Sequence, residues 1–324
     1  MTPSKILAIA CTFLSVAVSS ATAADAYPTK PIRWVVAYSA GGGSDALARA
    51  VGAQLSAQLG QSVLIDNRPG GATVIGADAV AKSPADGYTV LTADNGTLIF
   101  NTALFKKLPY DPNKDFAPVG LMAKFPLVLA VNPNSGYGSA KELIDAMRKQ
   151  PGKLSYATPG IGSPHHLAME MLKERTKVDV AHVAYKGAAP AIQDVVGGQL
   201  PIMVVDTAAG MQMMKAGKLK PLATFSKGRL PSMPDVPTLM ELGYTDMEAA
   251  AWQGLVVPSS TPKDVIAKLS TELQKAIASP AIQTQFATMG LEATPSDAAG
   301  MAKHWSDESR YWPKLIRDRQ ISLD

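Results

Sequence analysis

The stretch IRWVVAYSAGGGSDALARAVGAQLSAQL, residues 32–59, decides the fold. It opens with Ile32–Val36, a short run of β-branched and aromatic residues that is typical of a buried strand. From Leu47 to Leu59 apolar residues recur every four positions, and Gly60 follows, which predicts a helix with a glycine at its C-terminal end. The predicted order is strand, glycine turn and helix.

Three consecutive glycines, Gly41–Gly43, lie between this strand and this helix. Because glycine has no Cβ, the backbone can turn sharply here and approach a ligand closely. Ser44 or Asp45 can cap the first helical turn, whose free amides and positive dipole end suit a carboxylate or phosphate. Two or three hydrogen bonds to a charged group, at roughly 1.5 to 3 kcal/mol each, hold an anion without an arginine. The glycines fit a simple tight turn equally well, and their spacing matches neither GxGxxG nor a P-loop.

The chain begins with the pattern of a secretory signal peptide. Lys5 precedes an apolar run, Ile6–Val18, and an Ala-x-Ala site then predicts cleavage after Ala23. The single cysteine, Cys11, falls in the apolar run, so we expect no disulfide and no thiolate metal site in the mature chain. A lipoprotein anchored on Cys11 is disfavoured, because the stretch before this residue is very short. We therefore expect an exported, periplasmic protein.

Composition argues against two further classes of protein. Removal of residues 1–23 takes away one charged side chain and lowers the net charge from +4 to +3, and the basic residues are scattered, so we expect no nucleic-acid partner. After Ala23 no stretch is long and apolar enough to span a membrane. The remaining length, about 300 residues, suffices for two domains with separate cores.

Strands and helices alternate after Gly60, which predicts a parallel sheet with right-handed crossovers. Ligands of such sheets bind beyond the carboxyl ends of the strands. We therefore expect three polar segments, Ser39–Asp45, Asn67–Gly71 and Thr92–Asn95, to lie on one rim.

The second half of the chain predicts a second lobe. A segment punctuated by prolines, Leu108–Pro118, is interpreted as the crossing into it, and Trp252–Pro258 as the strand that returns. We predict an α/β, two-lobed clamshell with residues 24–125 and 252–324 in lobe 1 and residues 126–251 in lobe 2. Its cleft is a natural small-molecule site. The last helix is expected at about residues 297–312.

Four histidines are candidates for chemistry. His165 and His166 are adjacent, so on a helix they point apart, and no third ligand lies at a useful spacing for a metal. We expect one of the two to face the cleft as a hydrogen-bonding wall. His182 is interpreted as structural, and His304 is expected at the surface.

Acidic and basic residues at strand ends leave alternatives open. Two facing carboxylates among Asp45, Asp66, Asp94 and Asp206 would serve a glycosidase, but each is equally explained as a cap or turn residue. No G-x-S-x-G nucleophile elbow occurs, so an enzyme is disfavoured. Lys186 either supplies positive charge at the rim of lobe 2 or is an exposed lysine in a turn.

The order of motifs is more specific than any single motif. After the signal sequence come Tyr27-Pro28, Lys30-Pro31-Ile32, Gly41–Asp45, Asn67–Gly71, Asp86–Tyr88, Tyr156–Ser163 with His166, Tyr185–Gly187, Pro234–Thr238 and Trp252–Leu255. Across essentially the whole mature chain, this order closely resembles the Bug-type receptors, the extracytoplasmic solute-binding proteins of tripartite tricarboxylate transporters.

The resemblance implies a Venus-flytrap (periplasmic-binding-protein) fold that captures a small carboxylate and hands it to a membrane permease, as a monomer without catalysis, cofactor or metal. In that family backbone groups and ordered waters of two facing loops hold one carboxylate of the ligand. Carried over, these loops correspond to Ser39, Ala40, Gly42, Gly43, Ser44, Thr158, Tyr185, Lys186 and Gly187. Residues at neighbouring strand ends that are expected to contact the rest of the ligand are Thr92, Asn95, His166 and Asp206. Tyr38 and Asp45, which flank the glycine loop, are also expected among the ligand-binding residues.

Three residues depart from the family pattern beside the predicted cleft. Tyr38 stands where phenylalanine is usual, Ala184 replaces a proline, and His165 adds a second histidine. The ligand therefore stays open among di- and tricarboxylates, acidic amino acids and aromatic carboxylates. Two rival functions also stay open: presentation of the ligand to a signalling sensor kinase, and a secreted hydrolase of carboxylate esters.

Overall fold

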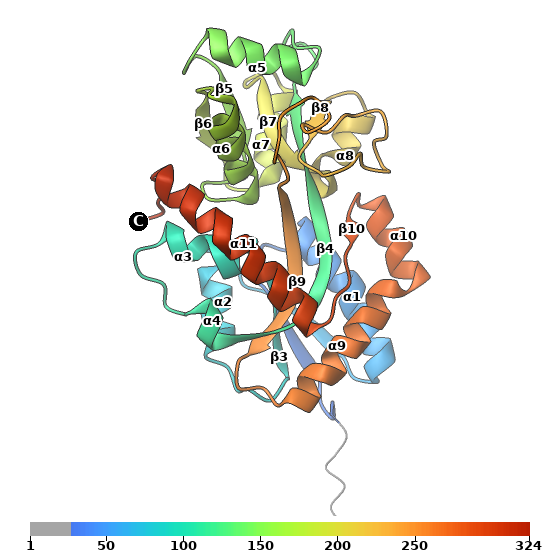
Figure 1. The fold of residues 1–324 in the computed structure, drawn as a ribbon. Helices are drawn as coiled ribbons and strands as arrows, with labels where there is room; N and C mark the ends of the chain where they lie inside the picture. The colour runs from blue at the N-terminus through green and yellow to red at the C-terminus, as the bar shows by residue number, and fades with distance from the viewer. Residues whose placement is uncertain (1–26) are drawn as a thin grey trace, which may run out of the picture.

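The computed structural model describes residues 27–324, so the expected signal peptide and its cleavage site lie outside the described residues. Two α/β lobes are stacked end to end and joined by two long strands, β4 (Phe116–Val131) and β9 (Ala250–Pro258) (Figure 1). In the described part of the chain, no helix combines the length and apolar character that a membrane crossing requires.

The sheet of lobe 1 has the order β2-β1-β3-β9-β4. Strands β1 (Ile32–Val36), β2 (Val63–Asn67) and β3 (Thr89–Asp94) are parallel. Strand β9 pairs antiparallel with β3, and β4 pairs antiparallel with β9. Alternate residues of β1 face opposite cores, with Trp34 on one side and Val35 on the other. The Trp34 side packs against α1 (Gly43–Leu59), α9 (Lys263–Ala278) and α10 (Pro280–Thr288). The Val35 side packs against α2 (Val74–Ala81), η1 (Gly96–Phe100), α3 (Asn101–Leu104) and α11 (Ala298–Asp318). Two short elements complete the lobe, α4 (Pro112–Asp115) and β10 (Glu292–Ala293), which pairs with β4.

The sheet of lobe 2 continues from β4 in the order β4-β7-β5-β6, with β8 (Lys220–Thr224) on the other side of β4. Its parallel strands are β5 (Ser155–Thr158), β6 (Ala181–Ala184) and β7 (Ile202–Asp206). Helices α5 (Ala140–Lys149) and α6 (Pro164–Thr176) cover one face, and α7 (Ala188–Val196) and α8 (Thr207–Lys215) cover the other.

The crossing into lobe 2 is a continuous strand, which corrects the expectation of a proline-punctuated connection. Strand β4 pairs with β9 up to Pro126 and with β7 from Leu127 onward. The register shifts next to Pro118, so the proline that cannot donate a ladder hydrogen bond lies at a bulge.

Helix α11 ends at Asp318, six residues beyond the expected end at Trp312. Pro313 lies inside the helix, at a cost of about 3 kcal/mol for an interior position. Leu315 and Ile316 are nevertheless buried, and their packing continues the helix past the proline. The extension brings the C-terminal end of α11 next to α6 of lobe 2 (Figure 1).

Candidate functional site

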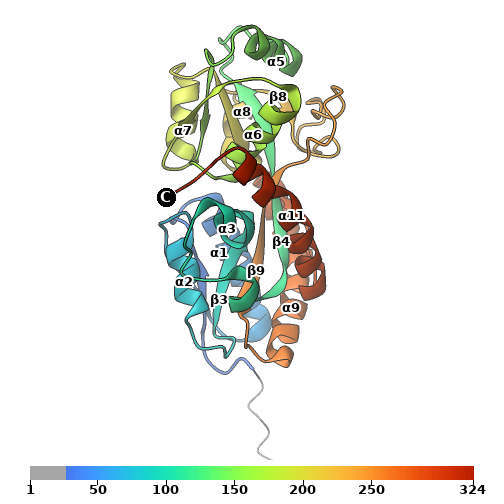
Figure 2. The ribbon, with the colours of Figure 1, turned by 60° about the vertical axis from the view of Figure 1, so that its left-hand side comes forward.

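The two lobes meet where the carboxyl ends of their parallel strands face each other (Figure 2). Gly43, the first residue of α1, lies against the start of α8, because a Cβ built on it would be 3.5 Å from Cβ of Ala208. The same Cβ would be 3.1 Å from the ring of Phe125 in β4. The glycine loop of lobe 1 therefore lies directly against lobe 2.

The first turn of α1 has no side-chain cap, contrary to the expectation for Ser44 or Asp45. The N-cap residue is Gly42, which has no side chain to offer. The Asp45 carboxylate instead accepts hydrogen bonds from the Gly41 amide (2.8 Å) and from Arg49 (3.0 Å) through Oδ2. The amides at the start of α1 thus remain available for an anion.

The loop before α1 is held in place by Asp45 and Asn67. Asn67 Nδ2 donates to Asp45 Oδ1 and to the Tyr38 carbonyl, both at 3.0 Å. Burial acts to raise the pKa of Asp45, but the hydrogen bonds from Arg49, Gly41 and Asn67 outweigh it and lower the pKa. Because both oxygens of Asp45 are engaged, we assign this residue to shaping the loop.

Two other predicted site residues also bond within lobe 1. The Tyr38 hydroxyl donates to Asp94, and burial followed by the Asp94 charge raises the pKa of Tyr38 well above its ordinary value. The Thr92 hydroxyl accepts a hydrogen bond from Trp34 Nε1 at 2.7 Å. The extra hydroxyl of Tyr38, compared with phenylalanine, therefore has a protein partner.

Two buried amides lie at the junction of β3 and β9. Asn95 is fully buried and donates from Nδ2 to the Ala250 carbonyl at 3.0 Å. Gln253 pairs with Asp94 across the strands and donates from Nε2 to the hydroxyl of Ser44. Gln253 was not singled out from the sequence as a ligand residue, although it lies in one of the quoted motifs; its position beside the glycine loop depends on the pairing of distant strands.

The facing loops of lobe 2 are tied together by their own hydrogen bonds. Thr158 Oγ1 lies 2.6 Å from His182 Nε2, and the Gly187 amide donates to the Pro159 carbonyl at 2.9 Å. The Tyr185 hydroxyl donates to Asp194 at 2.6 Å; burial and this carboxylate raise the pKa of Tyr185 to about 12. Lys186 is exposed.

The two adjacent histidines have different partners, as their helical positions require. His165 Nε2 lies 3.0 Å from Asp206 Oδ2, while Asp206 Oδ1 accepts from the Ala209 amide at 2.9 Å and caps α8. Burial acts to raise the pKa of Asp206, but His165 and the Ala209 amide hold the pKa below its ordinary value. His165, rather than His166, thus lies beside Asp206 at the strand ends of lobe 2.

His166 turns the other way. Its Nδ1 accepts from the Gly162 amide at 3.0 Å, and its ring stacks on that of His182 with centroids 3.9 Å apart. Burial lowers the pKa of His166 to about 3. His304, expected at the surface, is half-buried and meets the ring of Trp252 edge-on. Within residues 27–324 no three His, Cys, Asp or Glu side chains gather as a metal would require.

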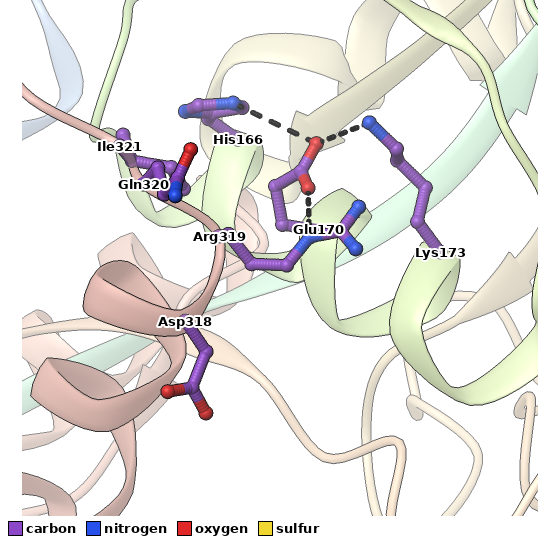
Figure 3. Close-up of a pocket in the computed structure, with 7 residues that line it drawn as sticks. All are labelled: His166, Glu170, Lys173, Asp318, Arg319, Gln320 and Ile321. Carbon is purple, nitrogen blue, oxygen red and sulfur yellow. Dashed lines mark hydrogen bonds and ion pairs between the residues drawn. The ribbon is translucent and has the colours of Figure 1, made fainter.

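A cavity of about 330 Å³ lies between α6 and the end of α11, away from the glycine loop (Figure 3). We call it the C-terminal pocket; it is lined by His166, Glu170, Lys173, Asp318, Arg319, Gln320 and Ile321. Glu170 Oε1 accepts from Lys173 at 2.6 Å, and Glu170 Oε2 accepts from Arg319 at 2.7 Å. Burial acts to raise the pKa of Glu170, but these two cations outweigh it and lower the pKa.

Residues 47–321 match the model of the tripartite tricarboxylate transporter family receptor. The chain belongs to this family. BugT of Bordetella pertussis is 33% identical over 328 residues, which cover 100% of both chains. A solved structure described as a periplasmic transporter is 35% identical, covers 92% of this chain and 100% of that one, and has a TM-score of 0.85. Rpa4515 of R. palustris, solved with adipate, is 33% identical, covers 90% and 97%, and has a TM-score of 0.84.

These likenesses confirm the predicted family and the two-lobed α/β periplasmic-binding-protein fold. A receptor family of this kind binds solutes and is not a family of enzymes. The protein is therefore a solute-binding protein of the tripartite tricarboxylate transporter family.

Proposed function

We propose that this receptor works in the periplasm, where it captures a small carboxylate between its lobes and delivers it to the membrane permease of a tripartite transporter. The observation that carries the proposal is the uncapped start of α1, which lies against Ala208 of the opposite lobe. Backbone amides at a helix start favour an anion. The adipate in the related Rpa4515 structure supports a carboxylate.

In lobe 1 we assign the acid group to the backbone of the glycine loop. The residues concerned are Ser39, Ala40, Gly42, Gly43 and Ser44. Asp45 and Asn67 hold this loop in shape by hydrogen bonds to it. Pre-formed donors of this kind bind an anion without the entropy loss of ordering long side chains.

In lobe 2 we assign the facing wall to Thr158, the turn Tyr185–Gly187 and the pair His165 and Asp206. His165 is buried and Asp206 is partly buried at the start of α8, where Ala208 lies against Gly43. Asn95 and Gln253 contribute the floor of the site beside β9. His165 replaces His166 in this assignment, because the ring of His166 faces the C-terminal pocket.

Closure of the lobes is the step that we propose for recognition by the permease. The moving bodies are residues 27–125 with 252–324 and residues 126–251, joined by β4 and β9. A ligand that contacts both lobes binds the closed form better and so shifts the population toward it.

A thermal-shift screen of the mature protein against di- and tricarboxylates, acidic amino acids and aromatic carboxylates tests the proposal. A ligand that binds only the folded state raises the Tm, by an amount that grows with ligand concentration. Sugars and divalent metal ions serve as the counter-panel. Shifts produced only by that counter-panel, or carboxylate shifts of equal size in a Gly42→Val variant, would contradict the assignment.

Delivery is tested in cells by deletion of the gene. Loss of uptake of the identified carboxylate supports transport through the permease. Retained uptake together with a lost transcriptional response to the same carboxylate would favour a receptor for a sensor kinase instead.

A further inference from the structure

The end of lobe 2 that is remote from lobe 1 is built from the starts of its strands. Strand β4 enters lobe 2 and ends at Val131, which pairs with Ile202 of β7 on one side and with Lys220 of β8 on the other. Strand β5 begins next to β7, and β6 begins next to β5. The turns before these strands therefore lie at one edge of the sheet, opposite the edge at Asp206, and α5 lies at the same end of the lobe (Figure 1). We call this surface the lobe 2 pole; it comprises residues 132–154, 176–180, 197–201 and 215–220.

The lobe 2 pole carries a group of lysines without an acidic partner. In the described part of the chain, the ion pairs of the pole join only Lys141 and Arg148 to Asp145, at 2.6 and 3.2 Å. The lysines outside these pairs are exposed, except for one that is half-buried, Lys220. The full set is Lys149, Lys153, Lys177, Lys215, Lys218 and Lys220. Their ammonium groups are thus available to a negatively charged partner.

Acidic residues of the pole do not balance these lysines. Asp145 already has two cationic partners, and Glu142 Oε2 accepts from the Gly138 amide at 2.7 Å. Asp179 is exposed and forms no ion pair with any residue from 27 to 324, so it offsets a single charge. Eight basic and three acidic side chains give the pole a net charge of +5, which exceeds the +4 of the whole chain. The basic residues are scattered along the sequence, and the fold gathers them here.

The opposite end of the molecule has a different pattern of charge. There, before β1 and β3 begin, Lys30 pairs with Asp86 at 3.3 Å and Lys82 pairs with Asp78 at 2.7 Å. Opposite charges therefore neutralise each other at the end of lobe 1. The positive surface is a property of one end of one lobe.

The strand spacing lets the fields of the pole lysines add. Neighbouring strands lie about 4.8 Å apart, so the ends of β6, β5, β7, β4 and β8 span about 20 Å. This width is about twice the Debye length at an ionic strength of about 0.1 M. Adjacent lysines therefore act together on a negatively charged surface that covers the whole pole.

The type of cation favours a membrane as that surface. The unpaired cations are all lysines, which carry hydrated point charges on flexible stems, whereas fixed recognition of one phosphate or carboxylate favours the planar guanidinium of arginine. Arg148, the arginine of the pole, is engaged by Asp145. Flexible lysines on several turns suit a laterally mobile layer of lipid phosphates, which offers charge density without a fixed geometry.

We propose that the lobe 2 pole docks on an anionic phospholipid membrane and holds the receptor reversibly at the bilayer. Lysines attract such a surface only within about a Debye length, so docking depends on salt and allows release. The pole lies at the opposite edge of the lobe 2 sheet from Asp206, so a docked receptor can still bind its carboxylate. This inference goes beyond the proposed function, and it holds whichever carboxylate is bound.

Co-sedimentation of the mature protein with vesicles provides the test. One set of vesicles contains phosphatidylglycerol and phosphatidylethanolamine, and the other contains phosphatidylcholine alone. We expect binding to the anionic set at an ionic strength of about 0.01 M, at least about tenfold weaker binding at about 0.15 M, and no binding to the neutral set.

Two triple variants with the same change in net charge locate the surface. The pole variant combines Lys153→Gln, Lys177→Gln and Lys218→Gln, one from each of three turns. We expect its binding to anionic vesicles to fall tenfold or more, since each lysine near the membrane contributes roughly fivefold. The control variant combines Lys106→Gln, Lys107→Gln and Lys263→Gln, exposed lysines of lobe 1 whose side chains form no ion pair with residues 27–324. Its binding should stay within about twofold of wild type.

The outcomes distinguish docking from carboxylate capture. Absence of binding to anionic vesicles at low salt, equal binding to neutral vesicles, or an equal loss in both triple variants overturns the inference. If the wild type ignores vesicles, and the pole variant alone loses its cross-links to the purified permease, the partner is an acidic protein surface and the membrane assignment is wrong. The Tm of both variants and its rise with a bound carboxylate should match wild type, because these substitutions lie outside the proposed site.

Discussion

The glycine loop and the C-terminal pocket differ in how their polar groups are used. At the glycine loop the start of α1 is uncapped, and neutral amides such as Asn95 keep an unpaired atom. In the C-terminal pocket the charges satisfy one another, with Lys173 and Arg319 both on Glu170 (Figure 3). The cavity of about 330 Å³ belongs to the second region. The proposed binding region therefore differs from the C-terminal pocket in its unpaired hydrogen-bonding groups, and not in a larger cavity or in more charged residues.

The C-terminal pocket also differs from the glycine loop because its ion pairs link residues of the two lobes. Glu170 belongs to α6 of lobe 2, while Arg319 follows α11, which packs on η1, α3 and β4. The amide of Leu323, further along, donates to the Leu104 carbonyl at 2.9 Å. The C-terminal segment therefore ties the two lobes together beside β4 and β9. We expect its ion pairs to contribute to folding rather than to recognition.

The largest effect should follow from Glu170→Gln. The Glu170 side chain is 6% exposed, that of Lys173 12% and that of Arg319 32%, so the change leaves one mostly buried and one partly exposed cation without a counter-charge. We expect a loss of about 3 kcal/mol in the free energy of unfolding, measured by urea denaturation. The affinity of the folded variant for the identified carboxylate should stay within about threefold of wild type.

Glu272→Gln is the matched control for that variant. Glu272 also accepts from two lysines, but their side chains are 50% and 60% exposed, so water replaces the lost pair. The Glu272→Gln change should lower the free energy of unfolding by less than about 1 kcal/mol. Equal destabilisation by both changes would show that the C-terminal pocket is an ordinary surface cluster and would break the comparison.

A second effect of the C-terminal pocket is a dependence of stability on pH. Burial lowers the pKa of His166 to about 3, and the neighbouring His182, Lys173 and Arg319 act in the same direction against Glu170. The unfolded chain takes up a proton as the pH falls through about 6.5, while the folded chain does not until about 3. The unfolded state therefore binds more protons across this window, and stability falls as the pH is lowered.

Between pH 6.5 and pH 5 the contribution of His166 is about 2 kcal/mol, above the range in which carboxylates titrate. Urea denaturation at several pH values measures it. In a His166→Gln variant the decline over this interval should be shallower. An identical pH profile for variant and wild type would assign the decline to other groups.

Gly42→Val tests the glycine loop by affinity. A Cβ on Gly42 would meet only the Ser39 carbonyl, at 3.7 Å, and the residue has an extended backbone with φ of −84°, so the folded state accommodates a side chain. We expect the Tm of the free protein to change little and the affinity for the carboxylate to fall tenfold or more, because the valine side chain obstructs access to the amides. Titration calorimetry and thermal unfolding measure the two quantities.

Gly60→Ala provides the opposite pattern in the same helix. Gly60 ends α1 in the left-handed conformation, φ 66°, where alanine costs about 1 kcal/mol. Its Tm should fall while its affinity is unchanged. If Gly42→Val resembled Gly60→Ala, the loop would be structural only, and the proposed site would lie elsewhere.

The sequence located the rim of lobe 1 because its signals are local. Strand β1, the glycines and α1 follow each other along the chain, and the ends of parallel strands necessarily share one edge. The bounds of α1 agree with the predicted helix through Leu59 and Gly60. The family resemblance added the fold as a whole, including the return strand at β9.

Residue roles within the rim depended on contacts between distant parts of the chain. Gln253 reaches Ser44 only because β9 pairs with β3. The choice between His165 and His166 is set by where α6 begins, at Pro164, because a shift of one residue turns both side chains by about 100° around the helix. Asp45 was expected at a cap or on the ligand, yet its partners come from Arg49, Gly41 and Asn67 in the folded loop. Such partner choices cannot be obtained from spacing alone.

Gly43→Ala is expected to have the smallest effect, and it examines the contact between the lobes directly. The added methyl group would lie 3.1 Å from the ring of Phe125 in the same lobe and 3.5 Å from Cβ of Ala208 in lobe 2, so it is tolerated only if the Phe125 ring shifts by a few tenths of an ångström. We expect about a threefold loss of affinity, since closure brings these atoms together, and no more than a small change in Tm. In the double variant Gly43→Ala with Phe125→Leu, the smaller side chain should restore part of that loss, which a double-mutant cycle measures as coupling. Additive effects would mean that Gly43 and Phe125 do not press on each other when the ligand is bound.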